Sequence, residues 1–333
     1  MSDSDTVRVG VIGRGFGGRV VAPTFEATDG CTVVDVVSPR DDEAVTALCA
    51  RDDVDLISVH SPPFMHLDHV RRAIDGGHAV LCDKPFGLNP VEAKEMCDLA
   101  RDAQVLNLVN FEFRYHPIRG KLRNLVLDGA VGTVEYVQWT SFMGWWRNPS
   151  RRYGWVFDAS RGGGWVRAAG AHVIDYLRWT FGEIVDASAA LRTTIPERAD
   201  ADGNMQRCTA EDGFVGTMRT DQNVWATIDA TATGAVDLFS RVTVIGSDGV
   251  LELLSDSVHE IGGRILLHTK EGTSEQLRIQ PWASPEAHDD SAMRPWLQVV
   301  CKAVRQGTAE PQSATFADGL ACARVLDQLT GQR

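Results

Sequence analysis

Three glycines near the start of the sequence have the spacing of a turn that binds a dinucleotide. They are Gly13, Gly15 and Gly18, and they follow an apolar run from Val7 to Ile12. The first glycine permits a tight turn, the second lets the backbone approach a pyrophosphate, and the third lets helix and strand pack closely. A helix predicted from Val20 to Glu26 would offer free N–H groups to the phosphates. A purely structural turn is the alternative. The residues expected to bind the cofactor here are Gly13, Gly15, Phe16, Gly17 and Gly18.

The end of the second predicted strand, Thr32 to Val37, is where NAD and NADP are distinguished. An acidic residue at this place bonds the ribose 2′-hydroxyl, whereas a nearby arginine accommodates the 2′-phosphate of NADP. The strand is followed by Ser38, with Arg40 two residues further on. This arrangement favours NADP over NAD. Asp41 and Asp42 could counter Arg40, and a solvated Arg40 is the alternative.

Strand-like and helix-like segments alternate along the first third of the chain. This alternation predicts a doubly wound parallel sheet, so we expect an α/β Rossmann domain over residues 1–118. The predicted strands are 7–13, 32–37, 55–60, 79–82 and 105–110, and the predicted helices are 20–26, 66–75 and 90–103.

The remaining residues, 119–333, have a different pattern. Residues 131–142 alternate like a half-exposed strand, and residues 164–181 have a helical pattern. Several strand-like runs separated by turn signals follow between residues 185 and 280. We therefore expect an α+β domain with an open, mainly antiparallel sheet. Two helices, 292–305 and 316–329, end the chain, either within this domain or packed back on the Rossmann domain.

Five further segments, in order along the chain, resemble the motifs of one family of oxidoreductases. The chain is similar to the glucose-fructose oxidoreductase, inositol dehydrogenase and rhizopine-catabolism (Gfo/Idh/MocA) family over nearly its whole length. The resemblance implies a Rossmann domain followed by a domain with an open sheet. The segments are Ser61-Pro-Pro-Phe-Met-His66, Leu81-Cys-Asp-Lys-Pro85, Asn110-Phe-Glu-Phe-Arg-Tyr-His-Pro117, Gly162-Gly-Gly-Trp-Val-Arg-Ala-Ala-Gly-Ala-His-Val-Ile-Asp175 and Ala314-Thr-Phe-Ala-Asp-Gly319.

The same resemblance implies further contacts with the cofactor, from Ser61, Pro62, His66, Asp83 and Lys84. With the selector residues, Ser38 and Arg40, these complete the expected cofactor site. The expected cofactor is NADP, or else NAD.

Oxidation of a secondary alcohol needs a base within hydrogen-bond reach of the hydroxyl. Lys84 is the best candidate, because it follows a buried strand and precedes a proline that restricts its backbone. His172 and Asp175 are three residues apart on a predicted helix and therefore share a face. We expect Lys84, His172 and Asp175 to be catalytic. A surface lysine and a structural histidine are the alternatives.

The sequence departs from the family pattern at two places. The position of the family's catalytic aspartate is Ala168, four residues before His172. More of the proton chemistry should therefore fall to Lys84 and His172, or the site is altered or inactive. Between Arg40 and Val54 there is room for only a short helix, so the sheet is expected to be one strand short there.

Aromatic residues suggest the class of substrate. Six of the nine tryptophans lie between residues 139 and 179, with arginines interleaved. Aromatic faces stack well on the C–H face of a pyranose, which favours a sugar, glycoside or cyclitol. Several of these tryptophans are equally suited to the core. The residues expected to bind substrate are Arg114, Tyr153, Trp155, Trp165, Arg167 and His172.

Composition excludes several other classes of protein. The net charge of −12 argues against nucleic acid as a partner. No apolar run is long enough to span a membrane, and the N-terminus does not resemble a signal peptide, so a cytoplasmic location is expected. The seven cysteines are scattered without a CxxC pair, which is typical of reduced thiols. No Cys/His cluster has zinc spacing, so we expect no metal.

Three functions remain open at this stage. The first is an NAD(P)-dependent dehydrogenase or reductase acting on a carbohydrate-like CH–OH group. The second is a glycoside hydrolase with bound NAD that transiently oxidises the sugar ring, and the third is a non-catalytic nicotinamide-binding sensor. The resemblance further implies a homodimer or homotetramer formed through the C-terminal sheet.

Overall fold

The computed structural model describes residues 6–255, 262–279 and 292–331. The chain divides into two compact units. The first comprises Met1–Glu112 and His288–Arg324, and the second comprises Phe113–Ala287 and Val325–Arg333. Each unit has a large sheet of its own.

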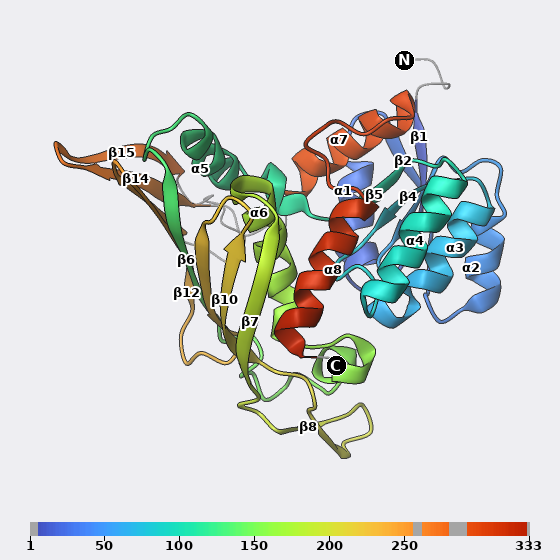
Figure 1. The fold of residues 1–333 in the computed structure, drawn as a ribbon. Helices are drawn as coiled ribbons and strands as arrows, with labels where there is room; N and C mark the ends of the chain where they lie inside the picture. The colour runs from blue at the N-terminus through green and yellow to red at the C-terminus, as the bar shows by residue number, and fades with distance from the viewer. Residues whose placement is uncertain (1–5, 256–261, 280–291, 332–333) are drawn as a thin grey trace. The chain divides into compact units, whose positions relative to one another are not determined.

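The first unit is built on five parallel strands in the order β2-β1-β3-β4-β5 (Figure 1). The central strand β3 and its neighbour β1 are apolar and buried along nearly their whole length, as expected for parallel strands covered on both faces. The predicted doubly wound parallel sheet is confirmed. The strands are β1 (Val7–Ile12), β2 (Cys31–Val37), β3 (Leu56–Val59), β4 (Ala79–Cys82) and β5 (Asn107–Val109).

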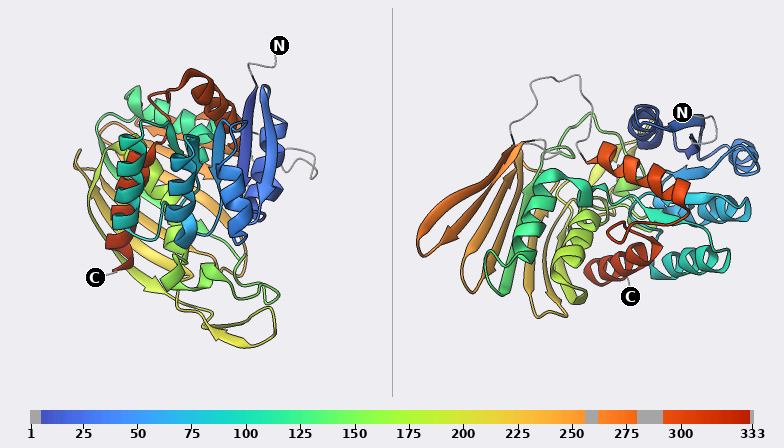
Figure 2. Two further views of the ribbon diagram at one scale, coloured as in Figure 1. Left: turned by 90° about the vertical axis from the view of Figure 1, so that its right-hand side faces the viewer. Right: turned by 90° about the horizontal axis from the view of Figure 1, so that it is seen from above.

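Helices cover this sheet on both faces (Figure 2). Helix α3 contacts both α2 and α4, whereas α1 contacts α7. A π-helical turn, η2 (Gly17–Val21), leads into α1, and a short 3₁₀ turn, η3 (Pro63–Met65), leads into α3. The boundary between the two units falls within α8. The helices are α1 (Ala22–Glu26), α2 (Asp42–Cys49), α3 (His66–Asp75), α4 (Pro90–Asp102), α7 (Met293–Gln306) and α8 (Phe316–Thr330).

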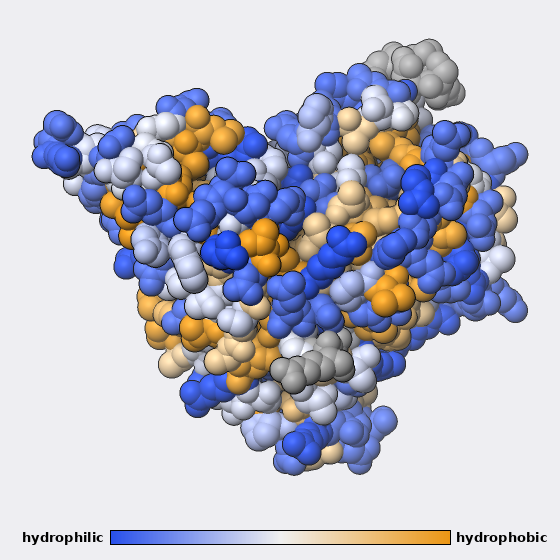
Figure 3. All heavy atoms as spheres, in the orientation of Figure 1, coloured by the Kyte–Doolittle hydropathy of each residue, from blue (hydrophilic) through white to orange (hydrophobic). Residues whose placement is uncertain are grey.

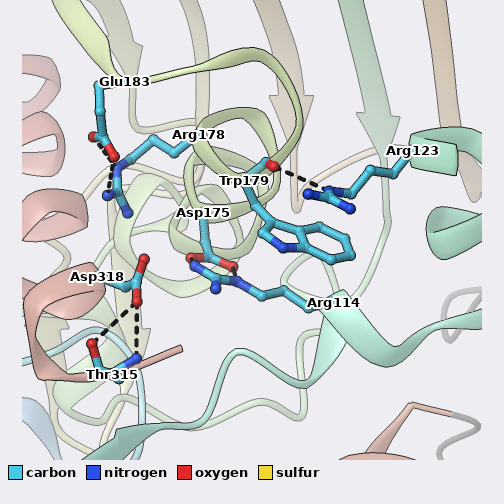
Figure 4. Close-up of polar contacts among 8 residues, drawn as sticks. All are labelled: Arg114, Arg123, Asp175, Arg178, Trp179, Glu183, Thr315 and Asp318. Carbon is cyan, nitrogen blue, oxygen red and sulfur yellow. Dashed lines mark hydrogen bonds and ion pairs between the residues drawn. The ribbon is translucent and has the colours of Figure 1, made fainter. Parts of the chain in front are cut away.

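Side-chain caps fix where these helices begin. Asp41 accepts a hydrogen bond from the Ala44 amide at the start of α2. Asn89 accepts from two amides at the start of α4, just before Pro90. In the first turn of α8, Asp318 accepts from both the amide and the hydroxyl of Thr315, the residue before the helix (Figure 4). Each cap satisfies N–H groups that have no partner inside the helix.

The short segment after Arg40 holds α2 and no further strand among its described residues. The chain passes from α2 directly to β3, which pairs with β1. The sheet therefore has the five strands that the length of this segment predicted.

Cys31 on β2 and Cys301 on α7 form a disulfide. The expectation of reduced thiols is therefore wrong for this pair, which is 270 residues apart in sequence and could not be paired from spacing. The other five cysteines form no disulfide, and four of them are buried.

Over α2, α3 and α4 the surface is mostly hydrophilic, with scattered apolar spots (Figure 3). In α3 the buried face includes Val70, Ala73 and Ile74. The helix thus turns its apolar stripe inward, as amphipathic helices of globular proteins do. Among the described residues no helix is long and apolar enough to cross a membrane.

The second unit is built on an eight-stranded sheet in the order β15-β14-β13-β12-β6-β11-β10-β7. Six of its seven strand pairings are antiparallel, and only β11 with β6 is parallel. The expected mainly antiparallel sheet is confirmed. The strands are β6 (Val134–Phe142), β7 (Ile184–Arg192), β10 (Gly213–Thr220), β11 (Trp225–Thr231), β12 (Leu238–Gly246), β13 (Val250–Ser255), β14 (Gly263–Thr269) and β15 (Gly272–Ile279).

Helices α5 (Pro117–Leu127) and α6 (Ala171–Phe181) contact each other, and α5 also contacts β13, β14 and β15. A π-helical turn, η7 (Val166–Gly170), leads into α6. Both helices lie along one face of the sheet (Figure 2). The strands alternate between buried and exposed residues, so the opposite face is open.

Short elements complete the second unit. A two-stranded ribbon is formed by β8 (Glu197–Ala199) and β9 (Met205–Arg207). Three 3₁₀ turns are η4 (Glu112–Tyr115), η5 (Trp155–Phe157) and η6 (Ala159–Arg161).

Candidate functional site

The glycine loop follows β1 and turns against the end of β3. At Gly13 φ is 141°, and a β-carbon there would lie 2.6 Å from the carbonyl oxygen of His60. At Gly17 a β-carbon would lie 2.8 Å from Cβ of His60. At Gly15, in contrast, a β-carbon would meet no atom of the protein within 4 Å. The loop therefore packs against His60 at Gly13 and Gly17, its inner side, and leaves space beside Gly15.

Close packing beneath the loop depends on Gly17 more than on Gly18. A β-carbon at Gly18 would lie 3.3 Å from the Val36 side chain, a smaller overlap than the one at Gly17. The helix that follows the loop has no side-chain cap, because Phe16 is at its N-cap position. The third N–H group of this turn, that of Arg19, donates to the carbonyl oxygen of Gly15 at 3.1 Å, and the N–H groups before it lie at the helix end that binds phosphates in dinucleotide sites.

The proposed selector residues lie after β2. The Ser38 hydroxyl accepts a 3.4 Å hydrogen bond from the Arg40 amide. Asp41 caps α2, and Asp42 forms an ion pair with Arg72, with 2.6 Å between nitrogen and oxygen. Arg40 is exposed and has no ion-pair partner among the described parts of the chain. Asp41 and Asp42, the two acids that could have neutralised the charge of Arg40, therefore interact with other groups.

Two histidines, His66 and His69, hold the segment from Ser61 to His66 in place through hydrogen bonds to Ser61. His66 is fully buried and bonds the Ser61 carbonyl oxygen at 2.7 Å. His69 bonds the Ser61 hydroxyl at 2.9 Å. Burial lowers the pKa of His66 to about 4, so its ring is neutral at pH 7. His66 thus supports the backbone of this segment, while Pro62 is partly exposed.

Asp83 follows β4 and accepts hydrogen bonds from three neighbours. Its Oδ1 accepts from the amide of Lys84 at 2.8 Å and from Nδ2 of Asn110 at 3.3 Å. Its Oδ2 lies 3.1 Å from Nδ1 of His60. Burial alone would raise the pKa of the Asp83 carboxyl, but the hydrogen bond with His60 and the nearby Lys84 charge outweigh burial and lower it to about 2. Asp83 is therefore ionised and fixed immediately before Lys84.

In the second unit, Arg114 and Asp175 form a bidentate ion pair (Figure 4). Arg114 Nε donates to Oδ2 at 2.8 Å, and its Nη2 donates to Oδ1 at 2.6 Å. Both side chains are buried. The structure thus brings together a residue expected to bind substrate and one expected to be catalytic, each as the partner of the other.

The pair joins two helical elements, since Arg114 lies on η4 and Asp175 on α6. Removing one member of a buried ion pair typically costs about 3–5 kcal/mol, because the other charge is left buried alone. The guanidinium of Arg114 also lies 5.8 Å from the Trp179 ring, which stacks beneath Arg123 at 4.2 Å. This arrangement fixes how η4 packs on α6.

His172 is buried on α6 and stacks on the Phe113 ring, with 4.0 Å between centroids and 20° between planes. Ala168 lies in the π-helical turn η7 that precedes α6. The structure therefore confirms that these two residues share one continuous helical segment. Phe113 was not predicted as part of the site, although it directly precedes Arg114 in the segment from Asn110 to Pro117 that resembles a family motif.

Of the expected aromatic substrate residues, Trp165 belongs to a cluster of aromatic rings, whereas Tyr153 and Trp155 are partly exposed. Trp165 is buried and makes edge contacts with Trp145 and Trp146, at centroid distances of 6.3 and 5.2 Å. Tyr153 lies 6.4 Å from the Phe157 ring, and burial raises the pKa of its hydroxyl. In this cluster Trp145 is exposed. Trp155 is partly exposed at the start of η5, and Arg167 is buried.

Glu211 is a buried acid near this cluster that the sequence did not single out. Its Oε1 accepts a 2.9 Å hydrogen bond from the Val166 amide, at the start of the helical segment that carries His172. Burial raises the pKa of the Glu211 carboxyl. Gly164 is required beside it, because a β-carbon there would lie 2.2 Å from Oε1. Glu211 thus acts as a cap that fixes the first turn of this segment.

Across the described residues no group of three or more histidine, cysteine or acidic side chains is placed to hold a metal ion. The glycine loop suits a cofactor that carries phosphates instead. The loop leaves space at Gly15, and the helix that follows has no side-chain cap, so backbone N–H groups can serve as the donors.

Comparison with known proteins agrees with this geometry. Residues 7–111 match the model of an oxidoreductase family with an NAD-binding Rossmann fold, and residues 120–252 match the model of the GFO/IDH/MocA C-terminal domain. The chain belongs to the Gfo/Idh/MocA family. It is therefore an enzyme of an NAD-binding oxidoreductase family.

Two relatives and one solved structure illustrate the similarity. An uncharacterized oxidoreductase of Synechocystis sp. is 28% identical over 320 residues, which cover 90% of this chain and 86% of that protein. Levoglucosan dehydrogenase of Pseudarthrobacter phenanthrenivorans is 29% identical over 191 residues, covering 55% of this chain and 48% of that protein. The structure of a levoglucosan dehydrogenase with NADH and levoglucosan has a TM-score of 0.84 at 19% identity, covering 98% of this chain and 96% of that one.

Proposed function

We propose that the chain is an NAD(P)-dependent dehydrogenase or reductase. It transfers a hydride between the nicotinamide and a secondary alcohol or ketone of a sugar, glycoside or cyclitol. The observation that carries the proposal is the glycine loop, which is closed against His60 and open at Gly15, in the same unit as the fixed Asp83–Lys84 turn. The name of the levoglucosan dehydrogenase relative supports the class of substrate.

The residues of the loop hold the cofactor, which supplies the hydride acceptor or donor when it is bound. Lys84 accepts the proton of the substrate hydroxyl in oxidation and returns it to the oxygen in reduction. His172 orients the substrate hydroxyl or takes the same proton. Since Ala168 has no carboxylate, these two residues carry the proton chemistry.

Asp175 and Arg114 support the site by positioning its helices, because they are hydrogen-bonded to each other. Their ion pair holds α6, and with it His172. The aromatic cluster around Trp165, with Tyr153, Trp155 and Arg167, supplies flat apolar faces and donors for the sugar ring.

The proposed activity is tested by following reduced nicotinamide absorbance with a panel of sugars, glycosides and cyclitols. We expect turnover with at least one member, and a loss of about 10²–10⁴ in kcat for Lys84→Ala, the usual contribution of a general acid–base residue. The matched control is Lys94→Ala, an exposed lysine paired with Asp98 on α4. Glycoside cleavage without net change in absorbance would instead identify the hydrolase, and binding without any turnover would contradict an active enzyme.

The cofactor is proposed to be NADP in preference to NAD. Ser38 offers a hydroxyl where NAD-specific enzymes have an acid, and Arg40 is exposed without an ion-pair partner in the described chain. A hydrogen bond to a charged group contributes about 1.5–3 kcal/mol. Arg40→Ala should therefore weaken NADPH binding about ten- to a hundredfold and leave NADH binding nearly unchanged, as measured by fluorescence titration.

The control for this measurement is Arg51→Ala, which removes another arginine of the first unit that pairs with Asp53. Equal affinities for the two cofactors in the wild type, or an equal loss of both in Arg40→Ala, would contradict the assignment.

The open face of the eight-stranded sheet is proposed to join copies of the chain in a homodimer or homotetramer. A cross-strand row of large apolar side chains lies on it: Trp225 pairs with Tyr136, which pairs with Ile245. They are 49%, 53% and 38% exposed. Exposed apolar rows of this kind are typical of surfaces that bind other proteins.

A charge in this row should dissociate the oligomer. We expect Trp225→Arg to reduce the mass in sedimentation velocity to that of a monomer, because an unpaired charge would be buried in the interface. Val91→Arg, on the exposed side of α4, is the control, since Val91 is 75% exposed in the first unit. A monomeric wild type, or an unchanged mass for Trp225→Arg, would contradict this interface.

A further inference from the structure

His60 lies between the glycine loop and the turn that carries Lys84, and the sequence analysis placed it at the end of a strand without assigning it to the site. It directly follows β3, and its side chain is buried. Its carbonyl oxygen and Cβ close the inner side of the loop at Gly13 and Gly17. Its ring also meets the Phe16 ring edge-on, with 6.0 Å between centroids. One residue therefore supports three positions of the loop.

The same ring is part of a chain of polar groups that ends at Lys84. Nε2 of His60 lies 2.7 Å from the Ser58 hydroxyl, and Nδ1 lies 3.1 Å from Oδ2 of Asp83. The other carboxylate oxygen accepts the Lys84 amide. Because an ionised carboxylate only accepts hydrogen bonds, Nδ1 of His60 must carry a proton and donate it.

Asp83 is steadied from its other side as well. Asn110 donates to it, and the carbonyl oxygen of the Asn110 side chain accepts a 3.0 Å hydrogen bond from the indole of Trp296 on α7. Both carboxylate oxygens of Asp83 thus accept hydrogen bonds. A network of hydrogen bonds of this kind restrains the geometry of the residues it contains.

We propose that His60 is a positioning residue for the oxidoreductase reaction. By holding Asp83, it fixes the backbone of Lys84, and by packing under the loop it fixes the cofactor's phosphate site, so one residue supports both parts of the site. This proposal rests on the proposed function, in which Lys84 moves the proton. Ser58, which contacts the His60 ring, and Asn110, which donates to Asp83, keep this chain of hydrogen bonds in place.

Two substitutions at His60 separate hydrogen bonding from packing. His60→Leu keeps an apolar body under the loop and removes the donor to Asp83. His60→Gln keeps an N–H that can reach the carboxylate. Since a misplacement of about 1 Å costs about a hundredfold in rate, we expect kcat to fall at least tenfold in His60→Leu and to stay within about threefold of wild type in His60→Gln.

The pH profile of kcat should also shift in His60→Leu, since the group that moves the proton is displaced, and return in His60→Gln. The matched control is His78→Leu, which removes another buried histidine of the first unit, bonded to the carbonyl oxygens of Cys49 and Val54. We expect it to lower the melting temperature and leave the pH profile unchanged. An equal fall in both His60 variants, or a loss confined to cofactor Kd with kcat unchanged, would overturn the proposal.

A second measurement does not depend on turnover. The sequence has only five lysines, so labelling of Lys84 by an amine reagent can be followed by mass spectrometry with the other four as internal references. In the cofactor-loaded protein we expect the pH dependence of Lys84 labelling to change in His60→Leu and not in His60→Gln or His78→Leu. An unchanged profile in His60→Leu would overturn the role of His60, whereas absent turnover with this change present would count against the proposed function alone.

Discussion

The close approach of the glycine loop to the end of β3 is the constraint on which the nucleotide-binding unit depends. Only residues without a side chain can lie where Gly13 and Gly17 meet His60, because a β-carbon at either would overlap its atoms. This contact turns the loop outward at Gly15. It also places the His60 ring against Asp83, so that the loop and the turn before Lys84 share one support. Parallel strands make this possible, since β1, β3 and β4 are neighbours in the sheet and end at the same edge.

A charged pair has the corresponding role in the second unit. Arg114 and Asp175 are buried together, and their two hydrogen bonds fix the orientation of α6 and of His172 upon it. Such a pair contributes less to net stability than to a single defined geometry, because desolvation of both charges offsets their attraction. Glu211 adds a second constraint at the start of the same helical segment, where it accepts from the Val166 amide. His172, which is proposed to meet the substrate, therefore lies on a helical segment held at two points.

Local patterns were sufficient to predict much of this structure. The glycine spacing, the alternating segments and the short stretch after Arg40 gave the Rossmann sheet, its helices and its five strands. Contacts between distant residues could not be obtained in this way. Pairing of Arg114 with Asp175, 61 residues apart, and of Cys31 with Cys301 depends on how the elements pack. His60 was missed because a histidine at the end of an apolar strand has no distinctive spacing, although its place one strand from the glycine loop was a usable signal.

We propose that the loop opening at Gly15 holds the pyrophosphate of a nicotinamide dinucleotide. Fluorescence titration of NADPH into the wild type and Gly15→Val, with the melting temperature of each recorded, measures whether it does. No protein atom lies within 4 Å of the position that a β-carbon would take at Gly15. We therefore expect an unchanged melting temperature and at least a tenfold loss of NADPH affinity for Gly15→Val. Undiminished NADPH binding by a folded Gly15→Val protein would contradict it.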